Sequence, residues 1–81
     1  MSSQMPKQRI VRFGPDYKLS IVDEQNVKGK YELAVFYKDA MVEMPGITDP
    51  DDTVTRFRTP EDVQCIMKKM FTITGKMPEN S

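Results

Sequence analysis

Apolar residues recur at helical spacing toward the end of the chain, which predicts one helix over residues 60–74. The i, i+3, i+4, i+7 and i+8 spacing of these residues aligns them on one helical face. Thr59 suits the N-cap, Pro60 suits the first helical position, and Asp62 stands where a capping box has its acidic residue. Gly75 then closes the helix. The apolar face consists of Val63, Ile66, Met67, Met70, Phe71 and Thr74.

Alternating apolar and polar positions before the helix predict short strands separated by turns. Gly14-Pro15-Asp16 is turn chemistry, and Lys38-Asp39 forms a two-residue hairpin turn. A parallel crossover needs about a dozen or more residues, so these short connections predict antiparallel neighbours. The predicted strands are residues 9–13, 17–22, 31–37, 40–44 and 53–58.

The order of the elements predicts an α+β fold, with an antiparallel meander of four or five strands and one C-terminal helix packed on one face. A helix of this length is marginal alone, so its apolar face must pack on the strands. Residues 7–76 are expected to form a single small domain. Residues 1–6 and 77–81 are polar and aperiodic, which predicts two flexible tails.

The predicted strand over residues 31–37 carries apolar residues on both faces. Leu33 and Val35 lie on one face, and Ala34 and Phe36 lie on the other. This pattern indicates a central strand, or a strand whose second face meets a partner. The predicted core consists of Val11, Phe13, Leu19, Ile21, Leu33, Val35, Val42, Phe57, Val63, Ile66, Met67, Met70 and Phe71.

The length and cysteine content favour a small cytoplasmic protein. A chain of 81 residues buries only a modest core, with roughly 60% of the unfolded surface removed from water. Its one cysteine, Cys65, cannot form an internal disulfide, which is typical of a reducing compartment. No apolar run reaches membrane-spanning length, and no signal-peptide core follows Met1, so we expect no membrane partner.

The sequence carries no recognisable catalytic or metal-binding motif. Histidine is absent, so Cys65 has no histidine with which to form a nucleophile pair. The acidic turn that begins at Asp49 fails the calcium-loop pattern, because Val54 and Pro60 replace its glycine and glutamate. The isolated glycines match no phosphate-binding loop. We therefore expect no enzymatic activity, no cofactor and no bound metal.

The charges cancel overall but are unevenly spread along the chain. Twelve basic and twelve acidic residues give zero net charge, yet residues 39–52 hold five acidic residues and no basic one. The acidic turn formed by Asp49, Asp51 and Asp52 is therefore the predicted contact region for another protein. Open strand edges offer a second route to a partner, because an unpaired edge can add a strand from another chain.

Basic residues beside aromatic ones provide a nucleic-acid alternative. Arg9 and Arg12 precede Phe13, and Arg56 and Arg58 flank Phe57. Such clusters bind single-stranded nucleic acid through stacking and phosphate contacts. Duplex-binding proteins usually carry a marked basic excess, which this chain lacks, so the nucleic-acid alternative ranks second.

Methionine is frequent, with seven residues in the chain. Met41 and Met44 lie on opposite faces of their predicted strand, so one of the two is expected to be exposed. Exposed methionine favours adaptable protein contacts. A methionine patch or an open strand edge is also compatible with a symmetric homodimer.

The stretch over residues 31–70 resembles small uncharacterised accessory proteins encoded by tailed phages. The shared features are a short strand pair, an acidic turn and the helix start Thr59-Pro60-Glu61-Asp62. The resemblance implies an accessory protein that binds and redirects a host protein in the host cytoplasm. Combined with the missing catalytic groups and the segregated charges, it predicts a non-enzymatic protein-binding module that inhibits or modulates a host protein.

Overall fold

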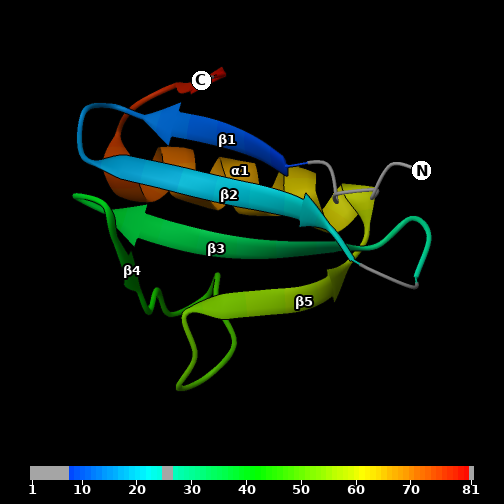
Figure 1. Ribbon diagram of the computed structural model, residues 1–81. Coiled ribbons are helices and arrows are strands. Elements are labelled where there is room, and N and C mark those ends of the chain that lie inside the picture. The colour runs from blue at the N-terminus through cyan, green and yellow to red at the C-terminus, as the bar shows by residue number, and fades with distance from the viewer. Residues whose placement is uncertain (1–7, 25–26, 81) are drawn as a thin grey trace, which may run out of the picture.

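A computed structural model of the chain describes residues 8–24 and 27–80. Within these residues, a six-stranded antiparallel sheet is covered on one face by a single C-terminal helix (Figure 1). The predicted α+β class and antiparallel meander are confirmed. The elements are β1 (Gln8–Phe13), β2 (Tyr17–Asp23), β3 (Tyr31–Tyr37), β4 (Ala40–Val42), β5 (Val54–Arg58), α1 (Pro60–Thr74) and β6 (Pro78–Asn80).

Two strands share the same side of β3. The sheet order is β4-β3-β2-β1-β6, and β5 also pairs with β3. Residues 35–37 of β3 pair with β4, whereas β5 pairs with the earlier part of β3. β2 lies along the other side of β3. Residues 43–53 therefore form a loop that connects β4 to β5 along one edge of the sheet. This loop contains the acidic turn.

Helix α1 begins and ends where the sequence predicts. The Thr59 hydroxyl accepts a hydrogen bond from the Asp62 backbone N–H at 3.1 Å, and the Asp62 carboxylate accepts one from the Thr59 N–H at 3.0 Å. These bonds complete the capping box and hold the pKa of Asp62 below its ordinary value. Gly75 adopts a φ of 70°, and its N–H bonds to the Phe71 carbonyl.

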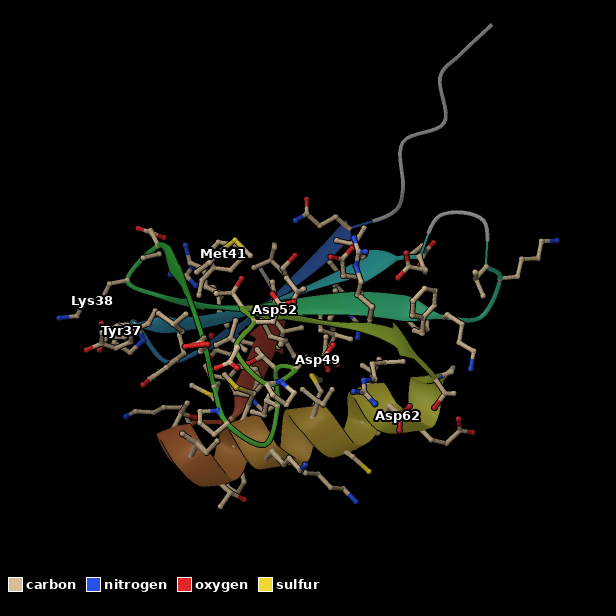
Figure 2. The ribbon with its side chains drawn as sticks, turned by 90° about the horizontal axis from the view of Figure 1, so that it is seen from below. Tyr37, Lys38, Met41, Asp49, Asp52 and Asp62 are labelled. Carbon is tan, nitrogen blue, oxygen red and sulfur yellow. The ribbon has the colours of Figure 1, made fainter. Side chains whose placement is uncertain are left out.

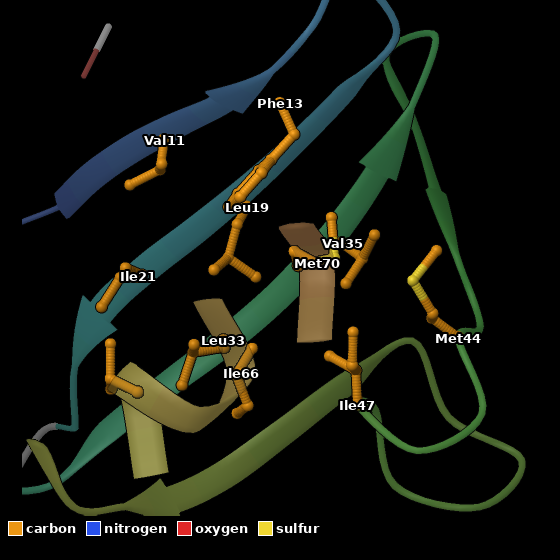
Figure 3. Close-up of a cluster of buried hydrophobic side chains, with 11 residues drawn as sticks. Val11, Phe13, Leu19, Ile21, Leu33, Val35, Met44, Ile47, Ile66 and Met70 are labelled. Atoms are coloured by element: carbon orange, nitrogen blue, oxygen red, sulfur yellow. The ribbon is translucent and has the colours of Figure 1, made fainter. Parts of the chain in front are cut away.

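The core lies between the sheet and α1 (Figure 3). Val42 and Met67, both predicted for the core, pack against it while partly buried. Met44 and Ile47 also belong to the core, although neither is in the predicted core. A turn over residues 44–48 directs both side chains into the core (Figure 3). The buried residues are Val11, Phe13, Leu19, Ile21, Leu33, Val35, Met44, Ile47, Val63, Ile66 and Met70.

The prediction that Phe57 belongs to the core is wrong. Its side chain is 56% exposed, and its backbone has a φ of 59°. The register shifts within β5, so that Arg58 lies opposite Tyr31 while Thr55 lies opposite Leu33. The extra residue is a β-bulge, which moves every later side chain to the other face. Strict alternation therefore predicts the wrong face for Phe57.

The prediction that Phe71 belongs to the core is also wrong, because its side chain is 45% exposed. Val63, Ile66 and Met70 are the buried residues of α1. Phe71 lies about 100° around the helix axis from Met70, at the flank of the buried stripe. The sheet covers the centre of the helical face and leaves this flank in contact with water.

The end of the chain differs from the predicted flexible tail over residues 77–81. Residues 78–80 form β6, which pairs antiparallel with Val11–Phe13 of β1. Pairing through backbone groups needs no apolar pattern, and an edge strand tolerates Pro78. Ser81 and the predicted tail over residues 1–6 lie outside the described residues.

Candidate functional site

The sheet face turned away from α1 is the strongest candidate for a binding surface. Figure 2 shows the sheet edge-on, with α1 on one side and Met41 on the other. We call this surface the open face. The strand register arranges its side chains in three rows that run across the strands. The rows are Arg12-Lys18-Phe36-Met41, Ile10-Ser20-Ala34-Val54 and Gln8-Val22-Glu32. Arg56, which contacts Glu32, continues the third row.

The open face is more apolar than a solvent-facing sheet surface needs to be. Antiparallel sheets with one wet face usually alternate cleanly between apolar and polar residues. Met41 is 47% exposed here, whereas Phe36 is half-buried beside it. The expectation that one of Met41 and Met44 is exposed is confirmed, because Met44 is buried. The apolar band of the open face comprises Ile10, Val22, Ala34, Phe36, Met41 and Val54.

Small residues lie at the middle of this face. Ser20 and Ala34 are buried and lie opposite each other on β2 and β3. The Gln8 amide donates to the Ser20 hydroxyl at 3.1 Å, which satisfies a polar group in this otherwise apolar row. Beside them, a hollow of about 380 Å³ is lined by Gln8, Ile10, Arg12, Lys18, Phe36 and Asp39.

Charged groups on and beside the open face pair with one another. The Lys18 ammonium contacts the Asp39 carboxylate at 2.7 Å, and the Arg56 guanidinium contacts Glu32 at 3.3 Å. The hydrogen bond and charge of Lys18, with a smaller contribution from Arg12, lower the pKa of Asp39. The cations of this surface therefore have carboxylates near them.

A cleft of about 650 Å³ lies on the other side of the sheet, between the strands and the first turns of α1. Its apolar wall includes Ile21 and Val63, and Arg9 and Asp23 stand at the same cleft. Both of these charged residues are exposed, so the cleft is an open notch rather than a closed pocket. Among the described residues that line the cleft, no buried polar group converges to orient a small molecule.

The predicted acidic contact region is built into the turn before β5. Asp49 accepts a hydrogen bond from Thr55 at 2.9 Å and contacts Arg58 at 3.2 Å. Asp52 accepts bonds from the next two backbone N–H groups, in the manner of an Asx-turn. Asp51 is exposed and has a φ of 59°. Two of the three carboxylates thus have structural partners, and a protein-contact role for this turn stays a prediction.

The four arginines of the nucleic-acid alternative do not share one surface. Arg12 and Arg56 belong to the open face, where Arg56 is paired with Glu32. Arg9 lines the cleft on the helix side. Arg58 bonds to the Thr55 hydroxyl at 2.6 Å and also contacts Asp49. Only Arg12 and Arg56 therefore lie on one face, and they stand at opposite corners of it, because Arg12 is in the Phe36 row on β1 and Arg56 is beside Glu32 on β5.

Three further observations bear on chemistry. Cys65 is exposed on α1. Within residues 8–24 and 27–80, no three His, Cys, Asp or Glu side chains come together in a way that could hold a metal ion. Over the same residues, no helix has both the length and the apolar character needed to cross a membrane.

Comparison with known protein families, curated proteins and solved structures found no match. The sequence signal that pointed to the open face was the pair of apolar residues Ala34 and Phe36 on the second face of β3. The other members of the face come from separate strands, and only the register shows that they are neighbours.

Proposed function

We propose that this chain is a non-enzymatic protein-binding module that contacts its partner through the open face. The observation that carries the proposal is the apolar band on the sheet face that α1 leaves uncovered. Burying such a band gains about 25 cal/mol for each Å² of apolar surface removed from water. The paired charges beside the band resemble the polar rim of a protein interface.

The chemistry of the face selects one kind of partner, a protein surface that is itself apolar and charge-balanced. Lys18 and Arg56 are each neutralised by a carboxylate, and Arg12 lies across from Glu79 in the strand register, so the face offers no excess of either sign. A phosphate backbone gains most from unpaired cations. Single-stranded nucleic acid also prefers several stacking aromatics, whereas Phe36 is the aromatic residue of the three rows.

The resemblance to tailed-phage accessory proteins suggests that the chain acts inside a phage-infected host cell. In that setting the partner is a host protein, and binding occludes part of its surface in the host cytoplasm. The absence of histidine favours modulation by occupancy over modulation by chemical modification, since a general base is then harder to supply.

Two substitutions test the proposal by capture from a bacterial lysate. Met41→Lys places a charge in the apolar band, and Ile73→Lys places the same charge on α1. The two side chains are matched in exposure, at 47% and 50%. We expect the unmodified chain and Ile73→Lys to capture the same specific protein, and Met41→Lys to lose it at least about tenfold, which corresponds to roughly 1.4 kcal/mol. Circular dichroism verifies that all three are folded.

Equal capture by all three chains would place the interface away from the open face. No specific protein in any of the three would refute the protein-binding function itself. Salt-titrated binding to single- and double-stranded DNA and RNA separates the nucleic-acid alternative, because phosphate contacts are strongest at low salt. Arg12→Gln should then weaken binding more than Arg9→Gln if the open face is the surface used.

A further inference from the structure

The open face is suited to contact with itself. We infer that, when no other partner is bound, a second copy of this chain occupies the open face, through the same face and in a symmetric, weak dimer. This inference rests on the proposed function, because it names an occupant of the same surface. A face-to-face pair is isologous, so each residue of the apolar band serves both copies.

Charge balance is the first argument for a second copy. On the open face Lys18 pairs with Asp39 and Arg56 with Glu32, and Arg12 lies across from Glu79 of β6 in the strand register. Equal numbers of cations and carboxylates prevent a net repulsion between two identical surfaces. The chain also has zero formal net charge, which removes the long-range repulsion that keeps many small proteins apart.

The shape of the face is the second argument. Its three rows extend across β1, β2, β3 and the β4–β5 side, without a helix or loop of residues 8–24 and 27–80 crossing them. Twisted sheets with such faces pack on each other at about 10 Å, either nearly aligned or nearly orthogonal. Phe36 and Met41 are the large side chains of the band and supply the bulk that such a layer needs.

The area sets the expected strength. Four strand positions at about 4.8 Å and five to six residues at about 3.4 Å make a face of roughly 20 by 18 Å. That is about 360 Å² on each copy, so two copies would bury roughly 700 Å² together, which is below the standard size of specific interfaces. The dimer should therefore dissociate readily, which leaves the face available to a different partner that binds more tightly.

Sedimentation velocity over a concentration series tests the inference with the intact chain. The sedimentation coefficient of the unmodified chain should rise from the monomer toward the dimer value between about 10 µM and 1 mM, as expected for a small interface. Met41→Lys should shift this transition to at least about tenfold higher concentration. Ile73→Lys, with the same charge at matched exposure, should leave it unchanged.

Amide chemical shifts recorded across the same concentrations locate the contact without a substitution. We expect concentration-dependent shifts in β2 and β3 and constant shifts in the middle of α1. A chain that remains monomeric to about 1 mM would overturn the inference, as would a dimer that Met41→Lys does not weaken. A third outcome separates the two proposals: the unmodified chain is monomeric, and only Met41→Lys fails to capture the specific protein from the lysate. That outcome would support the protein-binding function and reject a second copy as the occupant of the open face.

Discussion

Phe57 has a backbone conformation that is unusual for its residue type. Its φ of 59° lies in the left-handed region, which is a strained position for an aromatic L-residue. The strain follows from the bulge, which lets Thr55 remain buried and bonded to Asp49 while Arg58 reaches the same aspartate. The bulge thus allows both Thr55 and Arg58 to contact Asp49 of the acidic turn, and it requires one unfavourable dihedral angle at Phe57.

Phe57→Asn tests this assignment by its effect on stability. Asparagine tolerates the left-handed region, and the phenylalanine side chain is mostly exposed, so we expect the free energy of unfolding to stay within about 1 kcal/mol of the unmodified chain or to rise. Chemical denaturation measures this. Truncating a buried phenylalanine lowers the free energy of unfolding by about 3–5 kcal/mol. A loss of that size would show that Phe57 belongs to the core.

Asp62 gives the helix cap a dependence on pH. Hydrogen bonds from Thr59 lower its pKa in the folded state, so the ionised form is favoured by folding. A lowered folded pKa adds stability above the unfolded pKa, and this stability is lost as pH falls through the folded pKa. The loss begins as pH falls below about 4, near the ordinary aspartate value, and grows toward lower pH.

Thermal melts between pH 6 and pH 2 test that linkage, since the unfolded value lies near 3.9. Asp62→Asn should be less stable than the unmodified chain at neutral pH, and the difference should shrink as the pH falls. Glu61→Gln serves as the control, because Glu61 lies in the same helical turn without a hydrogen bond to Thr59 among the bonds described. A difference between Asp62→Asn and the unmodified chain that is constant with pH would contradict the assignment.

At the scale of elements, the sequence features that correctly predicted helices and strands were local ones. The helix was predictable because the N-cap, first-turn proline, apolar stripe and terminal glycine all occur within residues 59–75. The strands β1, β2 and β3 were predictable because short turns separate alternating residues. The bulge in β5 and the strand β6 escaped prediction, because both depend on pairing with distant strands. Residue pattern alone does not specify such pairing.

The β3–β4 hairpin turn is a further element whose sequence and conformation disagree. Lys38 and Asp39 have φ values of 51° and 69°, as a two-residue type I′ turn requires, yet neither is glycine or asparagine. The Lys38 ammonium lies 5.4 Å from the Tyr37 ring, and Asp39 pairs with Lys18. These two exposed contacts offset part of the strain.

Lys38→Asn should relieve that strain while Asp39 keeps its ion pair. We expect the free energy of unfolding to rise by about 0.5–1 kcal/mol, because asparagine tolerates a positive φ and the lost cation–π contact is weak at an exposed site. Lys28→Asn is the matched control, since Lys28 is an exposed lysine without a positive φ. A gain from both substitutions, or from neither, would indicate that turn strain is not the cause.

At the scale of the whole molecule, the sheet protects its edges better than its open face. On one side, β6 is three residues long and begins with Pro78, which cannot donate to a ladder. On the other side, β4 is short and β5 is bent by its bulge. Short, bulged and proline-bearing edges discourage strand addition. The predicted route to a partner through open edges is therefore less favoured than contact through the open face.

Removal of residues 78–81 tests whether β6 is the device that protects β1. Without β6, Val11–Phe13 lose their pairing on one side and keep their pairing with β2, so the melting temperature should fall and amide exchange in that segment should accelerate. The uncovered edge should also promote aggregation on storage. The untruncated chain with Glu79→Ala and Asn80→Ala is the control, because alanine retains the backbone donors and acceptors of these two residues.

The truncated chain also separates edge association from association through the open face. Met41→Lys introduced into the truncated chain should leave edge-driven aggregation in place, because residue 41 lies on β4 at the opposite side of the sheet. If Met41→Lys abolishes the aggregation instead, the open face drives it and β6 has no protective role. If truncation changes neither amide exchange in β1 nor aggregation, β6 contributes nothing to the edge, and the stability of β1 comes from β2 alone.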